Sequence, residues 1–187
     1  MLAANGVERG QVQEVPVGFD PRLLAAGKVD VYPVFESNEP DTLARLGTPV
    51  RLFRPTDYGV PGLGLTYITR QSLLSQDPDL LARFLKATLH AFDDARAQPD
   101  AATEVVMQYA TDEDRGHQRA MLDVELDMAL DGAAPRLGVG WATHQQWQAL
   151  HDSLTAFGGL SAPTDVDATF SDAILRRVYA GGPLQWP

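Results

Sequence analysis

The chain has 187 residues, 44% of them hydrophobic, and no cysteine. Length and composition are typical of a globular protein with one large domain or two small lobes, and the lack of cysteine excludes disulfides and thiolate chemistry. The net charge of −10, without any basic cluster, argues against nucleic acid or an anionic membrane surface as a partner.

The sequence predicts neither a membrane-spanning helix nor a signal peptide. No apolar run approaches the roughly 20 residues that span a bilayer, so we expect no direct membrane insertion. The first ten residues, MLAANGVERG, lack a basic region followed by an apolar region. We therefore expect that this start is not a signal peptide.

The first third of the chain alternates predicted strands with short predicted helices. Strands are expected over residues 12–17, 29–35 and 50–53. Helices are expected between them, over about 21–27 and 40–46, each ending at a glycine. This alternation is typical of βαβ units, so the fold class predicted is α/β with a parallel sheet.

A segment rich in proline and glycine, residues 54–64, is the best domain boundary, and the chain beyond it is mostly helical. One more strand is expected over 65–69. Helices are expected over about 71–76, 78–97, 100–110, 112–130, 144–157 and 169–180, with a loop over 131–140. The strand at 65–69 has no evident partner in the helical part, and its backbone donors would be unsatisfied unless it joins a sheet.

The candidate ligand site is the polar junction that follows the predicted strand 29–35. Glu36, Ser37, Asn38 and Glu39 lie there, just before a helix. In open α/β sheets ligands bind at such junctions, facing helix N-termini. The alternative is structural: Ser37 or Asn38 caps the helix, and Glu39 complements its dipole. Both interpretations can hold together.

Three aromatic or acidic residues near the same edge are weaker candidates. Phe19 could stack on a heteroaromatic ring, whereas Asp20 is more often a plain helix cap. Tyr58 could line a cleft from the Pro/Gly-rich segment or anchor that segment. Tyr67 is expected to face the core.

No catalytic or metal-binding pattern emerges, so no cofactor and no metal are expected. The four histidines, His90, His117, His144 and His151, are interpreted as surface residues of helices. The acidic run at 112–114 is read as a helix start, because it lacks the alternating ligands of a calcium loop. There is no nucleophile elbow, and the tryptophans at positions 141, 147 and 186 are interpreted as packing residues.

The chain also carries short motifs in a fixed order. These are GFD at 18–20, LLAAGKVD at 23–30, NEP at 38–40, DYG at 57–59, YITR at 67–70, PDLLARFLKA at 78–87, GVGW at 138–141 and VDATF at 166–170. Their order and spacing resemble the substrate-binding proteins of ABC importers in the NMT/THI5-like group, which bind thiamine pyrimidine precursors. The resemblance covers nearly the whole chain.

The resemblance implies a periplasmic-binding-protein-like fold of type II, with two lobes that close on a ligand. Matched to that pattern, residues 1–55 are part of lobe two, 56–64 a hinge crossing, and 65–187 the returning part of lobe one. The opening strands of lobe one have no counterpart here, so the chain resembles a binding protein without its N-terminal part.

The implied function is non-enzymatic binding of a pyrimidine or similar small nitrogen heterocycle, for delivery to an ABC permease outside the cytoplasm. Lobe-two contacts would come from Phe19, Asp20, Asn38 and Glu39. A biosynthetic enzyme of the same fold is one alternative, but that branch relies on a cysteine-rich motif that this sequence lacks. A ligand-sensing extracytoplasmic module of a signalling protein is the other.

Overall fold

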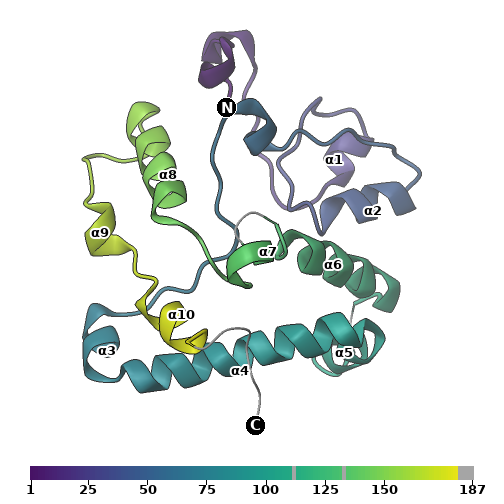
Figure 1. Ribbon diagram of the computed structural model, residues 1–187. Helices are drawn as coiled ribbons and strands as arrows, with labels where there is room; N and C mark the ends of the chain where they lie inside the picture. Colours follow the sequence, from purple (N-terminus) through teal and green to yellow (C-terminus); the bar gives the residue numbers. More distant parts are fainter. Residues whose placement is uncertain (111–112, 132–133, 181–187) are drawn as a thin grey trace.

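The computed structural model describes residues 1–110, 113–131 and 134–180, and these are mainly helical (Figure 1). The α-helices in this part are α1 (Arg22–Ala25), α2 (Glu39–Arg45), α3 (Gln71–Gln76), α4 (Pro78–Ala97), α5 (Pro99–Met107), α6 (Arg115–Met128), α7 (Ala134–Leu137), α8 (His144–Ala156), α9 (Val166–Thr169) and α10 (Ala173–Val178). Short 3-10 turns are η1 (Ala3–Asn5), η2 (Arg9–Gln11) and η3 (Pro55–Tyr58).

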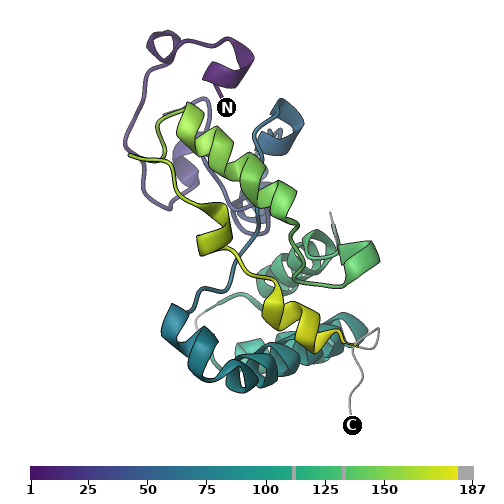
Figure 2. The same cartoon turned by 60° about the vertical axis from the view of Figure 1, so that its left-hand side comes forward.

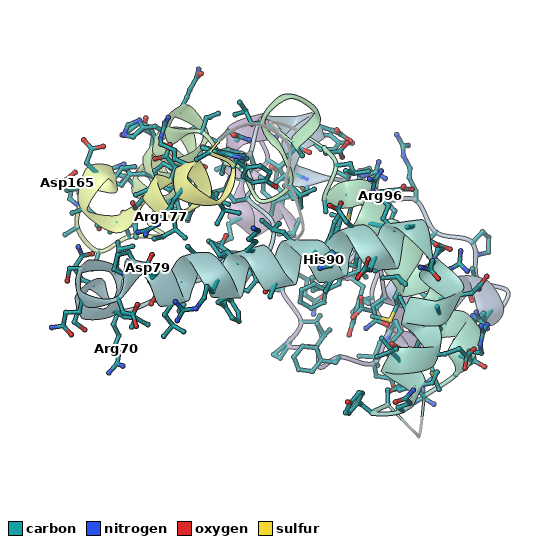
Figure 3. All side chains as sticks on the ribbon, turned by 60° about the horizontal axis from the view of Figure 1, so that its bottom comes forward. Arg70, Asp79, His90, Arg96, Asp165 and Arg177 are labelled. Carbon is teal, nitrogen blue, oxygen red and sulfur yellow. The ribbon has the colours of Figure 1, made fainter. Side chains whose placement is uncertain are left out.

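The longest helix, α4, forms the base of the molecule. Its start is fixed locally, because Asp77 Oδ1 accepts a hydrogen bond from the Leu80 backbone N–H at 2.9 Å and Pro78 occupies the first helical position. Helix α10 lies along one end of α4, and α5 packs at the other end (Figures 1 and 2). Arg177 of α10 reaches down to Asp79 of α4 and forms an ion pair there (Figure 3).

Helix α6 connects this base to the N-terminal part. It packs on α5 and on α2, which lies above it in Figure 1. Asp114 precedes α6 and its carboxylate accepts from the His117 backbone N–H at 2.8 Å. Leu43 of α2 is only 1% exposed, and Leu126 of α6 is also buried. The helix-helix contact between α2 and α6 therefore holds the predicted ligand junction in place.

The parallel sheet expected from the sequence is not formed in the part of the chain that the structure describes. Residues 12–17, 29–35, 50–53 and 65–69 are irregular, and no strand ladder is assigned to them. Apolar side chains in these segments remain in solvent: Val31 is 74% exposed, Ile68 94% and Leu65 96%. A strand needs partners for both its backbone groups and its apolar face, and neither is available to these segments in this arrangement. The two-lobe α/β architecture is thus not confirmed by the structure.

The helical predictions are largely confirmed, with two differences. The loop expected over 131–140 contains α7, and the helix expected over 169–180 is the shorter α10, preceded by a separate short helix, α9. They are separated because Phe170, at the end of α9, has an extended backbone with φ −111° and ψ 139°. Asp112 and Trp186 lie outside the described residues. No helix in the described part of the chain is long and apolar enough to cross a membrane.

Candidate functional site

A cavity of about 360 Å³ opens where the N-terminus of α2 meets the first turns of α6. Three sequence-predicted residues, Phe19, Asn38 and Glu39, line it. The other lining residues are Pro21, Thr42, Glu113, His117, Gln118 and Met121. Its volume falls within the range of small-molecule sites, about 300–1,000 Å³. Its walls come from parts of the chain that are far apart in sequence.

Asn38 occupies the cap position of α2 but does not cap it. Its side chain makes no hydrogen bond to the first turn of the helix. Instead, Asn38 Oδ1 lies 2.9 Å from Nε2 of His117, across the contact with α6. The purely structural interpretation of Asn38 as a helix cap is therefore wrong, and its amide faces a residue 79 positions away.

His117 is held at both ring nitrogens. Its Nδ1 lies 2.7 Å from Asp41 Oδ2, and the side chain is only 12% exposed. Arg45 Nε also donates to Asp41 Oδ2, at 2.6 Å, and Arg45 Nη1 donates to Asp114 Oδ1 at 3.1 Å. Burial raises the pKa of the Asp41 carboxyl, but hydrogen bonds from His117 and Arg45 outweigh that effect and bring the pKa below its ordinary value.

Glu39 is a buried carboxylate that borders two cavities. It is 5% exposed, and its Oε2 accepts from the Phe35 backbone N–H at 2.8 Å. This hydrogen bond is consistent with a structural role for Glu39 at the start of α2. It engages one of the two carboxylate oxygens. A second cavity, of about 260 Å³, shares Glu39 and Phe19 with the first. Its remaining lining is mostly apolar, including Tyr32, Val34 and Phe35.

Phe19 lines both cavities and its side chain is accessible to a ligand. Its side chain is 88% exposed, which is unusual for a phenylalanine, and it lies at the rim of both cavities. The backbone beside it is fixed because the hydroxyl of the buried Tyr32 donates to the Gly18 carbonyl oxygen. An exposed aromatic ring on an anchored backbone is suited to stack on a flat heterocycle.

Four other sequence-predicted residues lie outside the lining of both cavities. Ser37 is buried and its Oγ donates to Glu125 Oε1 of α6 at 2.6 Å. Glu36 pairs with Arg54, whose Nε donates to Glu36 Oε2 at 2.7 Å. Both residues connect separate segments of the chain.

Asp20 and Tyr58 also have structural partners. The Asp20 carboxylate accepts from the backbone N–H of Arg22 at 3.1 Å and from its side chain at 2.8 Å, and the pKa of Asp20 is lowered chiefly by the side-chain hydrogen bond. Tyr58 lies 6.0 Å from the ring of Phe53, between ring centroids, and its carbonyl oxygen accepts from Asn5. The structure thus brings together three of the seven predicted site residues.

The sequence interpretation of the histidines is wrong for two of them. His117 is nearly enclosed, as described above, and the side chain of His151 is only 16% exposed, with Nε2 accepting from the Thr164 backbone N–H. His90 and His144 are 43% and 53% exposed, as expected for helix surfaces.

The aromatic predictions have mixed outcomes. Tyr67 was expected in the core but is 64% exposed, and its ring meets Phe84 edge-on. Trp147 stacks on Phe170 with ring centroids 5.3 Å apart, which confirms a packing role.

The chemistry of the first cavity favours a ligand that donates hydrogen bonds. Glu39 and Glu113 supply carboxylates, and Asn38, Thr42 and Gln118 supply neutral polar groups. Neither lysine nor arginine occurs among the lining residues that the structure describes. Within the same described ranges, no group of three or more metal-binding side chains could hold a metal ion. A neutral or cationic ring compound with amino groups matches this lining better than a small anion does.

Comparison with known proteins places the chain in a family. A family model described as NMT1/THI5 like matches residues 1–102, more than half of the chain, and the chain therefore belongs to the NMT1/THI5-like family. This confirms the resemblance drawn from the sequence motifs. Proteins of this family have a periplasmic-binding-protein-like fold.

Two curated relatives are similar over most of the chain. It is 27% identical over 176 residues to the riboflavin-binding protein RibY of Chloroflexus aurantiacus, an alignment that covers 91% of this chain and 50% of that protein. It is 26% identical over 178 residues to the formylaminopyrimidine-binding protein of Halalkalibacterium halodurans, covering 91% of this chain and 53% of that protein. The chain thus spans about half the length of these relatives. No solved structure matches it significantly.

Proposed function

We propose that this chain is part of a solute-binding protein that holds a small nitrogen heterocycle in the cavity between α2 and α6. The observation that carries the proposal is that Asn38 and Glu39, at the start of α2, both line this cavity. The Asn38 side chain is not used for capping, and the buried Glu39 carboxylate borders the cavity with one oxygen engaged by the backbone. Both groups can hydrogen-bond the amino and ring nitrogens of a pyrimidine.

The names of the relatives support this class of ligand. One is a riboflavin-binding and the other a formylaminopyrimidine-binding protein, and both ligands contain flat, nitrogen-rich rings. Both names describe binding proteins, which supports a non-catalytic role. Within this class, we propose a thiamine pyrimidine precursor as the ligand, because its amino group matches the carboxylates of the lining.

The site also agrees with a two-lobe mechanism. We assign residues 1–55 to part of lobe two, 56–64 to the hinge crossing and 65–187 to the returning part of lobe one. The cavity is then lined by both lobes, with Asn38 on one and His117 on the other. A ligand that contacts both lobes would stabilise their closed arrangement. Delivery to an ABC permease in an extracytoplasmic compartment completes the proposed role.

The seven predicted residues have different weights in this proposal. Phe19, Asn38 and Glu39 contact the ligand directly. Ser37, Glu36, Asp20 and Tyr58 act on the site from outside its lining, through the hydrogen bonds and ring contacts described above.

The test is thermal unfolding of the chain with single ligands, followed by calorimetric titration of those that bind. The panel contains formylaminopyrimidine, riboflavin, thiamine, taurine and nitrate. A ligand at about 100 times its Kd should add about 2.7 kcal/mol to the free energy of unfolding. We expect a rise in midpoint with formylaminopyrimidine and none with zwitterionic taurine or with the anion nitrate.

Substitution of Glu39 shows whether the titrated site is the described cavity. Glu39→Gln keeps an oxygen for the Phe35 N–H but removes the carboxylate charge. Loss of a hydrogen bond to a charged group should weaken binding by about 10- to 150-fold, equivalent to about 1.5–3 kcal/mol. Glu14→Gln is the matched control, because Glu14 is exposed, pairs with Arg9 and lines neither cavity. Absence of any midpoint shift across the panel, or unchanged affinity in Glu39→Gln, would overturn the proposal.

A further inference from the structure

The partners of His117 determine which of its two ring nitrogens can gain or lose a proton. Asp41 accepts from Arg45 and lies 2.7 Å from His117 Nδ1. An ionised carboxylate can only accept hydrogen bonds, so His117 Nδ1 must carry a hydrogen. The other ring nitrogen, Nε2, is the one that can gain or lose a proton, and it faces Asn38.

This arrangement allows two hydrogen-bonding states of the Asn38 amide. When His117 is charged, Nε2–H donates to Asn38 Oδ1, and the amide NH₂ is left for a ligand. When His117 is neutral, Nε2 can only accept, so the amide must turn its NH₂ toward the imidazole and leave its oxygen for a ligand. The two ends of the amide are nearly the same in size, so the turn needs no rearrangement of the backbone.

The amide can make this turn because nothing else holds it. Asn38 does not bond to the first turn of α2, and its NH₂ makes no hydrogen bond to the residues that the structure describes. It is half-buried and lines the cavity together with His117. The free end of the amide is therefore available to a ligand.

We propose that His117 is a positioning residue whose protonation decides whether Asn38 offers the ligand a hydrogen-bond donor or an acceptor. The inference rests on the proposed function for the ligand, whereas the coupling between the two side chains exists without one. At low pH the site favours a carbonyl edge of a heterocycle, and at higher pH it favours an amino edge.

Other charged groups near His117 set the field in which it titrates. On α2 these are Asp41, Arg45 and Glu39, and before α6 they are Glu113 and Asp114. On α5, which packs against α6, they are Asp100 and Glu104, both paired with arginines of α6. Acidic groups predominate among them.

The coupling can be measured in the ligand-free protein by NMR. The side-chain amide of Asn38 and the ring nitrogens of His117 are followed across the range in which histidines titrate, about pH 5 to 8. We expect the Asn38 amide signals to move with the same midpoint as His117 Nε2, while His117 Nδ1 stays protonated throughout. Asn38 signals that are constant, or that follow another midpoint, would overturn the proposal.

Two variants separate this coupling from a general effect of pH. In His117→Gln the Asn38 signals should no longer titrate in this range. In His144→Gln they should titrate as in the wild type, because His144 lies on α8, is 53% exposed and pairs with Asp167. Titration of Asn38 that persists in His117→Gln would contradict the assignment.

The consequence for binding is measured with two probes that differ in one edge, 4-aminopyrimidine and 4-pyrimidinone. The ratio of their affinities should shift by about tenfold toward the aminopyrimidine as pH rises. Protonation of the probes themselves affects the wild type and His117→Gln equally. A difference between the two proteins in the pH dependence of the affinity ratio therefore reports which end of the Asn38 amide faces the ligand. Equal pH dependence in both would overturn the inference. If neither probe binds while the NMR coupling is present, the proposed function fails and the positioning role stands.

Discussion

Replacing Leu43 by alanine is the most direct test of the contact on which the site depends. Leu43 is 1% exposed and sits in α2, where this helix packs on α6. Removal of a fully buried leucine side chain usually lowers the free energy of unfolding by about 2–5 kcal/mol, through lost burial and the cavity left behind. We expect about 3 kcal/mol here, which corresponds to a fall in the melting temperature of about 6–12 °C for a chain of this size.

The matched control lies three residues further along. Leu46 directly follows α2 and is 53% exposed, so Leu46→Ala should change the free energy of unfolding by no more than about 0.5 kcal/mol. Urea unfolding followed by circular dichroism measures both variants under the same conditions. If Leu43→Ala costs less than about 1 kcal/mol, or if the two variants behave alike, α2 does not pack on α6 as described and the cavity loses one wall.

Three further predictions test separate features. Gly138→Ala should destabilise the fold by about 1–3 kcal/mol, because φ is +106° there and the added Cβ would lie 2.5 Å from the ring of Tyr179; thermal unfolding measures it. Asp77→Ala should cost about 1 kcal/mol by removing the cap of α4, seen in urea unfolding. Asp41→Asn should weaken the acid dependence of stability. The pKa of Asp41 lies below 3.8 in the fold, so its contribution is present at neutral pH and is lost as pH falls below about 4.

Each of these predictions has a matched control. Gly62→Ala adds a Cβ that meets nothing within 4 Å, and Asp77→Ser retains a capping oxygen, so both should stay close to wild-type stability. For Asp41→Asn the comparison is Asp30→Asn, at an exposed carboxylate outside the α2–α6 contact. Equal losses of unfolding free energy in a variant and its control would refute the corresponding reasoning. For Asp41→Asn, the same fall in stability below about pH 4 as in the wild type would refute it.

Helix starts could be predicted from the sequence because they are encoded locally. Asp77 with Pro78 opens α4, and Thr143 with Gln146 forms the reciprocal capping box of α8, as their spacing indicates. All these residues interact within one turn of each other. No knowledge of the remaining chain is needed to predict such contacts.

The pairing of strands into a sheet could not be predicted in the same way, because it depends on residues far apart in the sequence. The apolar residues concentrated over 29–35 and 65–69 indicate strands, yet the pattern does not contain the partner that would complete the ladder. The exposed Leu65 and Ile68 show that, in this arrangement of the chain, their apolar faces are not covered.

The site was predicted in part for the same reason. Asn38 and Glu39 were found because they follow one another at the end of a predicted strand. His117 was missed as a site residue, since it lies 79 residues beyond Asn38, in the first turn of a polar helix, and no local pattern marks it. Only the packing of α6 on α2 reveals that this histidine is enclosed between Asp41 and Asn38.

The ion pair between Asp79 and Arg177 also bears on how the chain is made. The two residues are 98 positions apart, although α10 lies directly on α4. During synthesis at about 5–20 residues per second, the N-terminal turn of α4 waits about 5–20 s before its partner helix is made. Neighbouring helices such as α5 can pack on α4 within that interval. The face that α10 finally covers is open meanwhile to chaperones and to other nascent chains.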